Sequence, residues 1–337
     1  MKALITTPRG KVFDTFFPPE NIEYINSLGE IIWNQTDQHM SKAEILEKIP
    51  GCDVYVTTWG SHRLDADLLD AAPGLRLLTH LCGTVVPVVS DAVWERGVRV
   101  LTGNGYFAES VAEGTLAYIL STLRDIPFYN RRTKENRIWH TDDDDNQGLA
   151  GKRIGIVSYG AVARHLVRIL SVFRVEMYVY DIHALPEEDC RRYGLHQASL
   201  EEIFSSCDII TLHTPLLDAT RHLIGEDLLR LIRPGALFVN TSRGAVVDQR
   251  ALEKQLAERR FRAVLDVYEE EPPQPDCILY DLDNVIMIPH MAGPTVDLRQ
   301  VIARELMEES AAFIHDGIEP KNEVTRAVAE YMTRGSS

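Results

Sequence analysis

The sequence predicts an α/β protein with two doubly wound domains, each built on a parallel β-sheet. Short apolar runs alternate with amphipathic segments along both halves of the chain, a rhythm typical of parallel sheets covered on both faces. The 337 residues are enough for two domains with separate cores. Polar residues also recur just after the apolar runs, at the sheet edge where ligands bind in open α/β sheets.

The first part of the chain predicts one such sheet. The expected strands are residues 3–6, 30–33, 54–57, 75–78 and 98–101. The expected helices are residues 19–28, 41–49, 64–72 and 90–96. Loops 8–10, 59–61 and 82–84 follow three of these strands, so we expect them to form one wall of a cleft.

The rest of the chain predicts a second series, preceded by a helix at 109–124 and a polar connection at 130–147. The aspartates at 142–145 lack the central glycine and closing glutamate of a calcium loop, so a solvated connection is expected. The expected strands are residues 153–157, 177–180, 208–212, 236–239, 263–266 and 285–288. After them we expect a helix at 295–315, extended chain at 318–324 and a disordered tail from Met332.

The bulk composition argues against several classes of function. The formal net charge of −15 argues against nucleic-acid binding, because phosphates require lysine and arginine. The five cysteines are scattered without C-x-x-C spacing, which predicts neither a metal site nor a disulfide framework. No apolar run has the length of a membrane span or a signal peptide, so we expect no membrane association and a cytoplasmic location.

A dinucleotide-binding turn is predicted where the strand at 153–157 meets the next helix. The fingerprint places glycines at positions 158, 160 and 163, and this chain has Ser158, Gly160 and Ala163. Gly160 lets the backbone approach a pyrophosphate, Ala163 is a tolerated replacement, and Ser158 departs from the pattern. Asp181 ends the next strand, where a carboxylate binds ribose hydroxyls and repels a 2′-phosphate, so NAD is expected rather than NADP. The structural alternative is a strand–helix turn with an incidental aspartate.

Three polar residues at successive strand ends form the candidate catalytic site. Arg243 lies in the segment 240–248, after the strand at 236–239, and offers a two-pronged donor to a carboxylate. Glu271 and His290 follow the next two strands. In a purely structural interpretation, Arg243 caps a helix, Glu271 is solvated and His290 is a satisfied loop histidine. The coincidence of all three favours a site.

Four motifs carry a family resemblance over residues 150–296. They are Leu212-His213-Thr214-Pro215 with Thr220, Asn240-Thr241-Ser242-Arg243-Gly244, Asp266-Val267-Tyr268 through Glu271-Pro272, and Pro289-His290-Met291-Ala292-Gly293. In order and spacing they resemble the NAD-dependent D-isomer-specific 2-hydroxyacid dehydrogenases, which include phosphoglycerate, glycerate and D-lactate dehydrogenases.

The resemblance implies a discontinuous domain organisation. A flavodoxin-like substrate domain would comprise residues 1–105 plus 297–330, and a Rossmann NAD-binding domain, residues 106–296, would be inserted into it, with residues 331–337 as a tail. Members of the family usually form homodimers that pair through the NAD-binding domain.

The resemblance also implies a role for each motif residue. Arg243 would bind the substrate's carboxylate and carbonyl oxygen, His290 would act as acid and base, and Glu271 would fix its tautomer. Asp266 would face the nicotinamide amide. The full set of expected cofactor contacts is Tyr159, Gly160, Ala161, Val162, Asp181, His213, Thr214, Pro215, Thr220, Thr241, Ser242, Arg243, Asp266, His290, Ala292 and Gly293. No metal is expected.

The chain departs from the family at its substrate wall. A Gly-rich stretch with an Asn-x-Asp pair is replaced by residues 81–89, although backbone N–H groups there still suit a carboxylate. An Arg-Ser-Arg run that reaches phosphate in phosphoglycerate enzymes is replaced by residues 59–61, which makes a phosphorylated substrate less favoured. The expected substrate contacts are Trp59, Cys82, Gly83, Thr84, Arg243 and His290.

The leading hypothesis is therefore an NAD-dependent enzyme that reduces a small 2-oxo acid to its D-2-hydroxy acid. One alternative is an NAD-sensing binding protein, similar to a corepressor, with little or no turnover, because fold alone does not separate the two. Another is a related enzyme acting on phosphite, formate or a phosphorylated acid. The presence of Arg243, Glu271 and His290 together favours catalysis.

Overall fold

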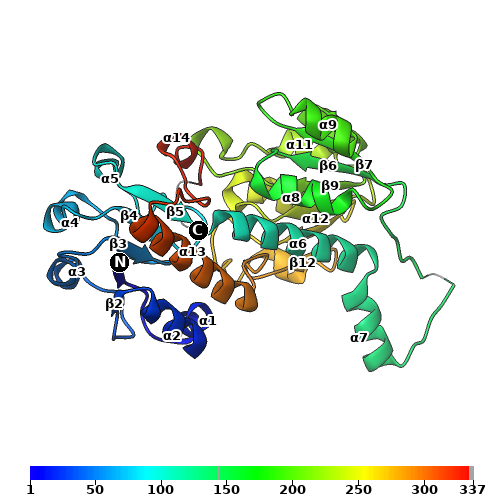
Figure 1. Cartoon of the computed structure of the whole chain (residues 1–337). Coiled ribbons are helices and arrows are strands. Elements are labelled where there is room, and N and C mark those ends of the chain that lie inside the picture. The colour runs from blue at the N-terminus through cyan, green and yellow to red at the C-terminus, as the bar shows by residue number, and fades with distance from the viewer. Residues whose placement is uncertain (143, 334–337) are drawn as a thin grey trace. The chain divides into compact units, whose positions relative to one another are not determined.

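The computed structural model describes residues 1–142 and 144–333 (Figure 1). The chain divides into two compact units. The first comprises Met1–Phe107 together with the segment that starts at Pro294, and the second comprises Ala108–Gly293. Helix α6 (Asn104–Leu123) begins in the first unit and continues into the second. No helix among the described residues is long and apolar enough to cross a membrane.

The first unit contains a parallel sheet in the order β2-β1-β3-β4-β5, which is the flavodoxin-like order. The strands are β1 (Lys2–Ile5), β2 (Glu30–Trp33), β3 (Val54–Thr57), β4 (Leu77–His80) and β5 (Arg99–Thr102). The helices are α1 (Lys11–Phe16), α2 (Pro19–Ser27), α3 (Lys42–Lys48), α4 (Ala66–Ala71), α5 (Asp91–Glu95), α13 (Val296–Asp316) and α14 (Arg326–Ala329).

Apolar side chains on both faces of this sheet explain why helices cover both sides. Along β3, Tyr55 packs into the core beneath α3, α4 and α5, whereas Val54 and Val56 pack into the core beneath α1, α2 and α13. Successive side chains of a strand point to opposite faces, so a continuous apolar run is buried on both sides. The uninterrupted apolar runs of the sequence therefore correspond to strands that are buried on both faces.

The second unit contains a parallel sheet in the order β12-β11-β10-β9-β6-β7-β8, the Rossmann arrangement extended by one strand. The strands are β6 (Arg153–Val157), β7 (Glu176–Tyr180), β8 (Leu195–Gln197), β9 (Ile209–Leu212), β10 (Leu237–Asn240), β11 (Arg262–Leu265) and β12 (Val285–Met287). The strand order reverses between β6 and β9, and the crevice at such a switch point is where open α/β sheets bind ligands.

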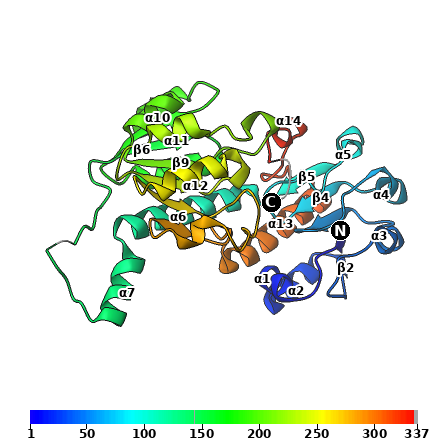
Figure 2. The same ribbon diagram turned by 180° about the vertical axis from the view of Figure 1, so that it is seen from behind.

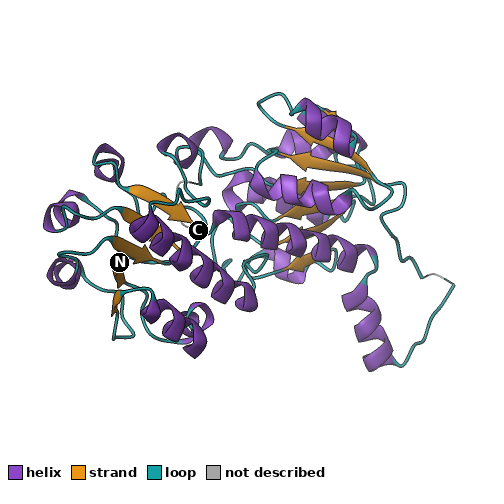
Figure 3. Cartoon of the chain, in the orientation of Figure 1, coloured by secondary structure: helices purple, strands orange, loops and turns teal. Residues whose placement is uncertain are grey.

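Helices also cover both faces of the second sheet. Helices α6 and α8 (Ala161–Leu170) pack on one face; α10 (Leu200–Ser206), α11 (Glu226–Leu231) and α12 (Gln249–Ala257) pack on the other (Figure 2). The remaining helical segments, visible in Figure 3, are α7 (Ile126–Asn136), α9 (Glu187–Tyr193) and the 3₁₀ turns η1 (Asp218–Thr220), η2 (Gly244–Val246) and η3 (Ile278–Asp281). The predicted fold class, two doubly wound parallel-sheet domains, is confirmed.

Two of the differences from the predicted elements follow from how little these elements bury. Helix α7 replaces part of the expected polar connection; it buries none of its side chains, so it leaves no apolar periodicity in the sequence. Arg132 of this helix donates to both carboxylate oxygens of Asp144, at 2.6 and 3.1 Å, while Asp143 lies outside the described residues. The sequence pattern does not indicate strand β8, because only Leu195 of its three residues is buried.

The prediction of a disordered tail from Met332 is wrong for its first two residues. Met332 packs against the core of the first unit, and Thr333 is 8% exposed. The Thr84 hydroxyl donates to the backbone carbonyl of Thr333 at 3.2 Å. These contacts depend on residues far apart in the sequence, which explains why local composition did not reveal them. Residues 334–337 lie outside the described part of the chain.

Candidate active site

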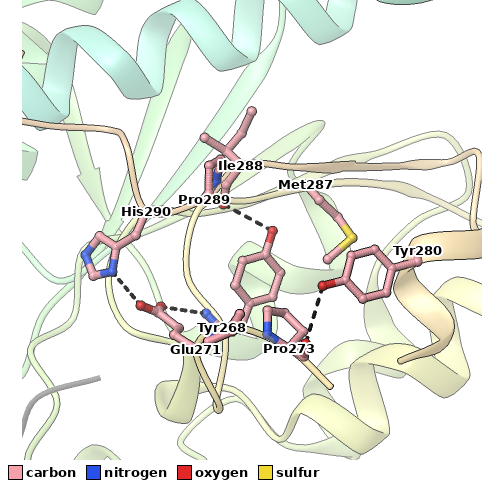
Figure 4. A pocket seen from close by; sticks show the side chains of 9 residues that line it. Tyr268, Glu271, Pro273, Tyr280, Met287, Ile288, Pro289 and His290 are labelled. Atoms are coloured by element: carbon pink, nitrogen blue, oxygen red, sulfur yellow. Dashed lines mark hydrogen bonds and ion pairs between the residues drawn. The ribbon is translucent and has the colours of Figure 1, made fainter. Parts of the chain in front are cut away.

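His290 and Glu271 form a hydrogen-bonded pair in the second unit. The Nδ1 atom of His290 lies 2.7 Å from Oε2 of Glu271, and the backbone N–H of Tyr268 donates to Oε1 of Glu271 at 3.0 Å (Figure 4). An ionised carboxylate only accepts hydrogen bonds, so the pair assigns a proton to Nδ1 of His290. The carboxylate is 17% exposed and the imidazole 38%, which leaves Nε2 as the ring nitrogen for a reacting group.

A mostly apolar cavity of about 500 Å³ adjoins this pair (Figure 4). Its lining consists of Tyr268, Glu271, Pro272, Pro273, Tyr280, Met287, Ile288, Pro289 and His290. The cavity therefore places a largely apolar surface beside the imidazole.

Arg243 is held by a polar turn at the carboxyl end of β10. The side-chain oxygen of Asn240 accepts from the backbone N–H of Ser242 at 3.0 Å and from its hydroxyl at 2.7 Å. The guanidinium of Arg243 donates to the Ser242 carbonyl at 2.6 Å. Burial lowers the pKa of Arg243, and the negative charges of Glu271 and Asp266 oppose that shift. A guanidinium remains charged after such a shift, so Arg243 is a fixed cation beside the pair.

Gly244 brings the Arg243 segment against the segment that carries Glu271. A Cβ at Gly244 would overlap the backbone of Tyr268 and Glu269. Because the obstructing atoms are backbone, no side-chain rotation would relieve the overlap. The glycine of this motif therefore permits the close packing that places Arg243 and Glu271 in one site.

Asp266 holds the loop that follows β12. Its buried carboxylate accepts from the backbone N–H groups of Met291 at 2.7 Å and Ala292 at 3.1 Å, and the Tyr118 hydroxyl lies 3.3 Å from it. Burial raises the pKa of Asp266, and these hydrogen bonds oppose the rise. The sequence indicated a cofactor contact for Asp266 but did not reveal that its carboxylate binds the loop of His290.

The turn after β6 has the geometry of a dinucleotide-binding loop. Gly160 precedes α8, and a Cβ built on it meets no atom within 4 Å, so a ligand can approach the backbone there. The carboxylate of Asp181 accepts from the backbone N–H of Tyr159 at 2.7 Å and of His183 at 2.9 Å. Asp181 thus braces the loop, and each of its oxygens retains capacity for a further hydrogen bond.

Ser158 occupies the backbone conformation for which the fingerprint uses glycine. Its φ of +74° lies in the left-handed region, which costs a residue with a Cβ roughly 1–2 kcal/mol. Its hydroxyl hydrogen-bonds that of Thr214 at 2.9 Å, and its N–H donates to the carbonyl of Tyr180 at 2.7 Å. The departure from the fingerprint is therefore accommodated without loss of the turn.

A family model, related proteins and a solved structure all match this chain and point to one family. The model of the D-isomer specific 2-hydroxyacid dehydrogenase, NAD binding domain, matches residues 116–292. Over 300 residues the chain is 32% identical to a glyoxylate reductase of Korarchaeum cryptofilum, covering 88% of this chain and 89% of that protein. It is 30% identical to a hydroxypyruvate reductase of Thermotoga maritima, covering 81% and 89%. A phosphoglycerate oxidoreductase structure from Rhizobium etli matches with a TM-score of 0.79 at 25% identity, covering 97% and 99%.

The chain belongs to the D-isomer-specific 2-hydroxyacid dehydrogenases. It is thus an oxidoreductase of the class that acts on CH–OH groups with a nicotinamide dinucleotide. The residues present fit such a cofactor, because the open backbone at Gly160 and the free N–H groups at the start of α8 form an anion-binding cradle.

Several further family positions lie at the switch point, beside the fingerprint turn. His213 is buried, burial lowers its pKa to about 3, and its Nδ1 has no hydrogen-bond partner among the described residues. Thr220 accepts from the backbone N–H of Leu217 at 2.8 Å and donates to the carbonyl of Pro215 at 2.6 Å. Thr220 therefore braces its own loop.

Four of the expected substrate contacts of the dehydrogenase, Trp59, Cys82, Gly83 and Thr84, lie in the first unit, whereas Arg243 and His290 lie in the second. Trp59 is 43% exposed and packs edge-on against Phe16 and Phe107, with the guanidinium of Arg299 5.2 Å from its ring centre. Burial raises the pKa of the Cys82 thiol, which disfavours a nucleophilic thiolate.

The loop that contains Cys82, Gly83 and Thr84 offers its backbone to a ligand. Among the described residues, the N–H groups of these three consecutive positions have no hydrogen-bond acceptor. Their carbonyls are partly engaged, since the Thr102 hydroxyl donates to those of Cys82 at 3.0 Å and Gly83 at 2.6 Å. Successive unpaired N–H groups bind anions without any particular side chain.

Proposed function

We propose that this dehydrogenase reduces a small 2-oxo acid to its D-2-hydroxy acid with NADH, and catalyses the reverse oxidation. The observation that carries the proposal is the 2.7 Å contact between His290 and Glu271, with Arg243 as a fixed cation beside it. We assign substrate binding to the first unit and NAD binding to the second.

In this mechanism the residues of the protein stabilise the developing charge and transfer the proton. When bound, NADH would supply a hydride to the ketone carbon. Arg243 binds the carboxylate and stabilises the negative charge that develops on the ketone oxygen. His290 donates its Nε2 proton to that oxygen, and Glu271 stabilises the doubly protonated imidazole through Nδ1. In the oxidation, Nε2 accepts the proton from the hydroxyl group.

Three observations support the substrate class and the choice of NAD. The unpaired N–H groups at Cys82, Gly83 and Thr84 suit a substrate carboxylate. Two relatives are named for glyoxylate and hydroxypyruvate, both small 2-oxo acids. Asp181 directly follows β7, where its carboxylate would repel the 2′-phosphate of NADP.

The decisive experiment follows NADH oxidation by absorbance with glyoxylate, pyruvate, hydroxypyruvate, a branched-chain 2-oxo acid, phenylpyruvate and phosphohydroxypyruvate. We expect turnover with at least one of them and much poorer turnover with NADPH. Tight NADH binding with no turnover across the panel would instead support the NAD-sensing alternative.

Two histidine variants test the assigned acid and base. His290→Ala should lower kcat at least a hundredfold while NADH binding stays close to wild type, because general acid–base catalysis contributes roughly 10²–10⁴-fold. His222→Ala is the matched control: His222 also contacts a glutamate, Glu269, at 2.8 Å, but has no assigned role. Wild-type turnover in His290→Ala would remove the proposed role.

We also propose that the protein is a homodimer that pairs through the second unit. Ile126 and Phe128 on α7 and Trp139 just after it are 55%, 42% and 83% exposed. Exposed apolar side chains that form a contiguous patch mark interaction surfaces, and we infer that these three belong to one such patch. Analytical ultracentrifugation should show a dimer that Phe128→Ser/Trp139→Ser weakens; a wild-type monomer at micromolar concentration would refute the assembly.

A further inference from the structure

The loop that carries His290 adopts a conformation that needs support. His290 has a φ of +53°, in the left-handed region that is unfavourable for a residue with a Cβ. Such a conformation persists only where the surrounding structure holds it. On one side the support is Asp266, whose carbonyl accepts from the backbone N–H of His290 at 2.9 Å and whose carboxylate binds the next two N–H groups.

Helix α6 supports the same loop from another side. A Cβ built on Gly114 would lie 2.6 Å from the carbonyl oxygen of Ala292 and 3.1 Å from its Cα. A Cβ built on Gly293 would lie 2.9 Å from the hydroxyl oxygen of Ser110. Ser110, Gly114 and Tyr118 are spaced four residues apart and share one face of the helix, and Tyr118 reaches Asp266 at 3.3 Å.

We propose that Gly114 is a positioning residue for His290. Its missing side chain lets the α6 backbone lie directly against Ala292, so that helix and Asp266 together hold the loop in the conformation that aims the imidazole at Glu271. The inference rests on the proposed role of His290 as acid and base. Gly114 belongs to none of the motifs through which the sequence indicates NAD binding or catalysis.

The geometry predicts how an alanine at Gly114 affects the stability of the protein and the rate of the reaction. Alanine in a helix interior is favoured over glycine, so helix propensity alone predicts a more stable protein. At Gly114 the new methyl group meets backbone, which has no rotamer to move, and the loop must shift by several tenths of an ångström or more. Misplacement of catalytic groups by about 1 Å costs on the order of a hundredfold in rate.

The test compares Gly114→Ala with Gly105→Ala, the same substitution in the same helix. A Cβ at Gly105 meets nothing closer than Asn322 Oδ1 at 3.8 Å, an ordinary contact. We expect Gly114→Ala to lower kcat about tenfold or more at a temperature well below its Tm, with a smaller proportional change in the NADH Kd. Some fall in Tm is expected, because the new methyl group meets backbone. Gly105→Ala should retain the wild-type kcat. Wild-type kcat in Gly114→Ala, or a weakening of NADH binding as large as the kcat loss, would overturn the positioning role.

One further variant separates this inference from the proposed function. If His290→Ala is inactive and Gly114→Ala is fully active, only the positioning role fails. If His290→Ala keeps wild-type turnover, the acid–base assignment itself fails and the positioning role fails with it. Loss of kcat in both variants, larger in each than any change in NADH binding, supports both.

Discussion

Substitution of Glu271 by glutamine probes the pair on which the proposed chemistry depends. The carboxylate accepts from two donors, Nδ1 of His290 at 2.7 Å and the Tyr268 backbone N–H at 3.0 Å. Glutamine has the same shape but only one accepting oxygen, so its NH₂ group must face one of these donors. The substitution also removes the negative charge that stabilises a doubly protonated imidazole.

The expected magnitude follows from the strength of a charge-assisted hydrogen bond. Such a bond contributes about 1.5–3 kcal/mol, and 1.36 kcal/mol corresponds to tenfold in rate. Glu271→Gln should therefore lower kcat for 2-oxo acid reduction about 10- to 150-fold. The loss should appear in kcat rather than in the NADH Kd, because the pair acts on the proton that is transferred to the substrate.

The assay is NADH oxidation at saturating 2-oxo acid over a range of pH, with NADH binding measured separately by fluorescence. Glu269→Gln is the matched control, because Glu269 contacts His222 at 2.8 Å and lies two residues from Glu271 without a role in the proposed site. The control should behave as wild type. A Glu271→Gln enzyme with wild-type kcat would refute the role assigned to the pair.

Three further predictions concern packing, backbone strain and acid stability. Gly244→Ala should lower kcat at least tenfold and cost about 1–3 kcal/mol in urea unfolding, because its Cβ overlaps backbone; wild-type values would contradict the packing. Ser158→Gly should change stability by less than about 1 kcal/mol, since relief of strain is offset by a lost hydrogen bond and greater chain entropy; a larger change in urea unfolding would refute this balance. Burial lowers the pKa values of His80 and His213 to about 3, whereas an unperturbed histidine in the unfolded chain has a pKa of 6.5. Between these two pH values only the unfolded chain binds the two protons. Stability should thus fall as pH drops below about 6.5, by up to about 1.4 kcal/mol per pH unit for each histidine, and His213→Gln should flatten the urea-unfolding slope; an unchanged slope would exclude that contribution.

Much of the fold was predictable because it depends on local periodicity. Uninterrupted apolar runs such as residues 54–57 predict strands buried on both faces, and Val54 and Tyr55 indeed pack into opposite cores. Elements with little burial left no such signal, as α7 and β8 show. The Asx turn at Asn240 was open to prediction from its spacing to Ser242, since this pattern is local.

The sequence by itself determined the fold class, the family and the identity of the candidate catalytic groups, because strand patterning and motif spacing are properties of short segments. Only the tertiary structure decided how these groups are held. The overlap that makes Gly244 necessary, the hydrogen bonds of Asp266 to the His290 loop and the contact of Gly114 with Ala292 each join segments distant in the chain. At the two glycines the packed backbones are so close that they exclude even one methyl group, and no local sequence pattern indicates such contacts.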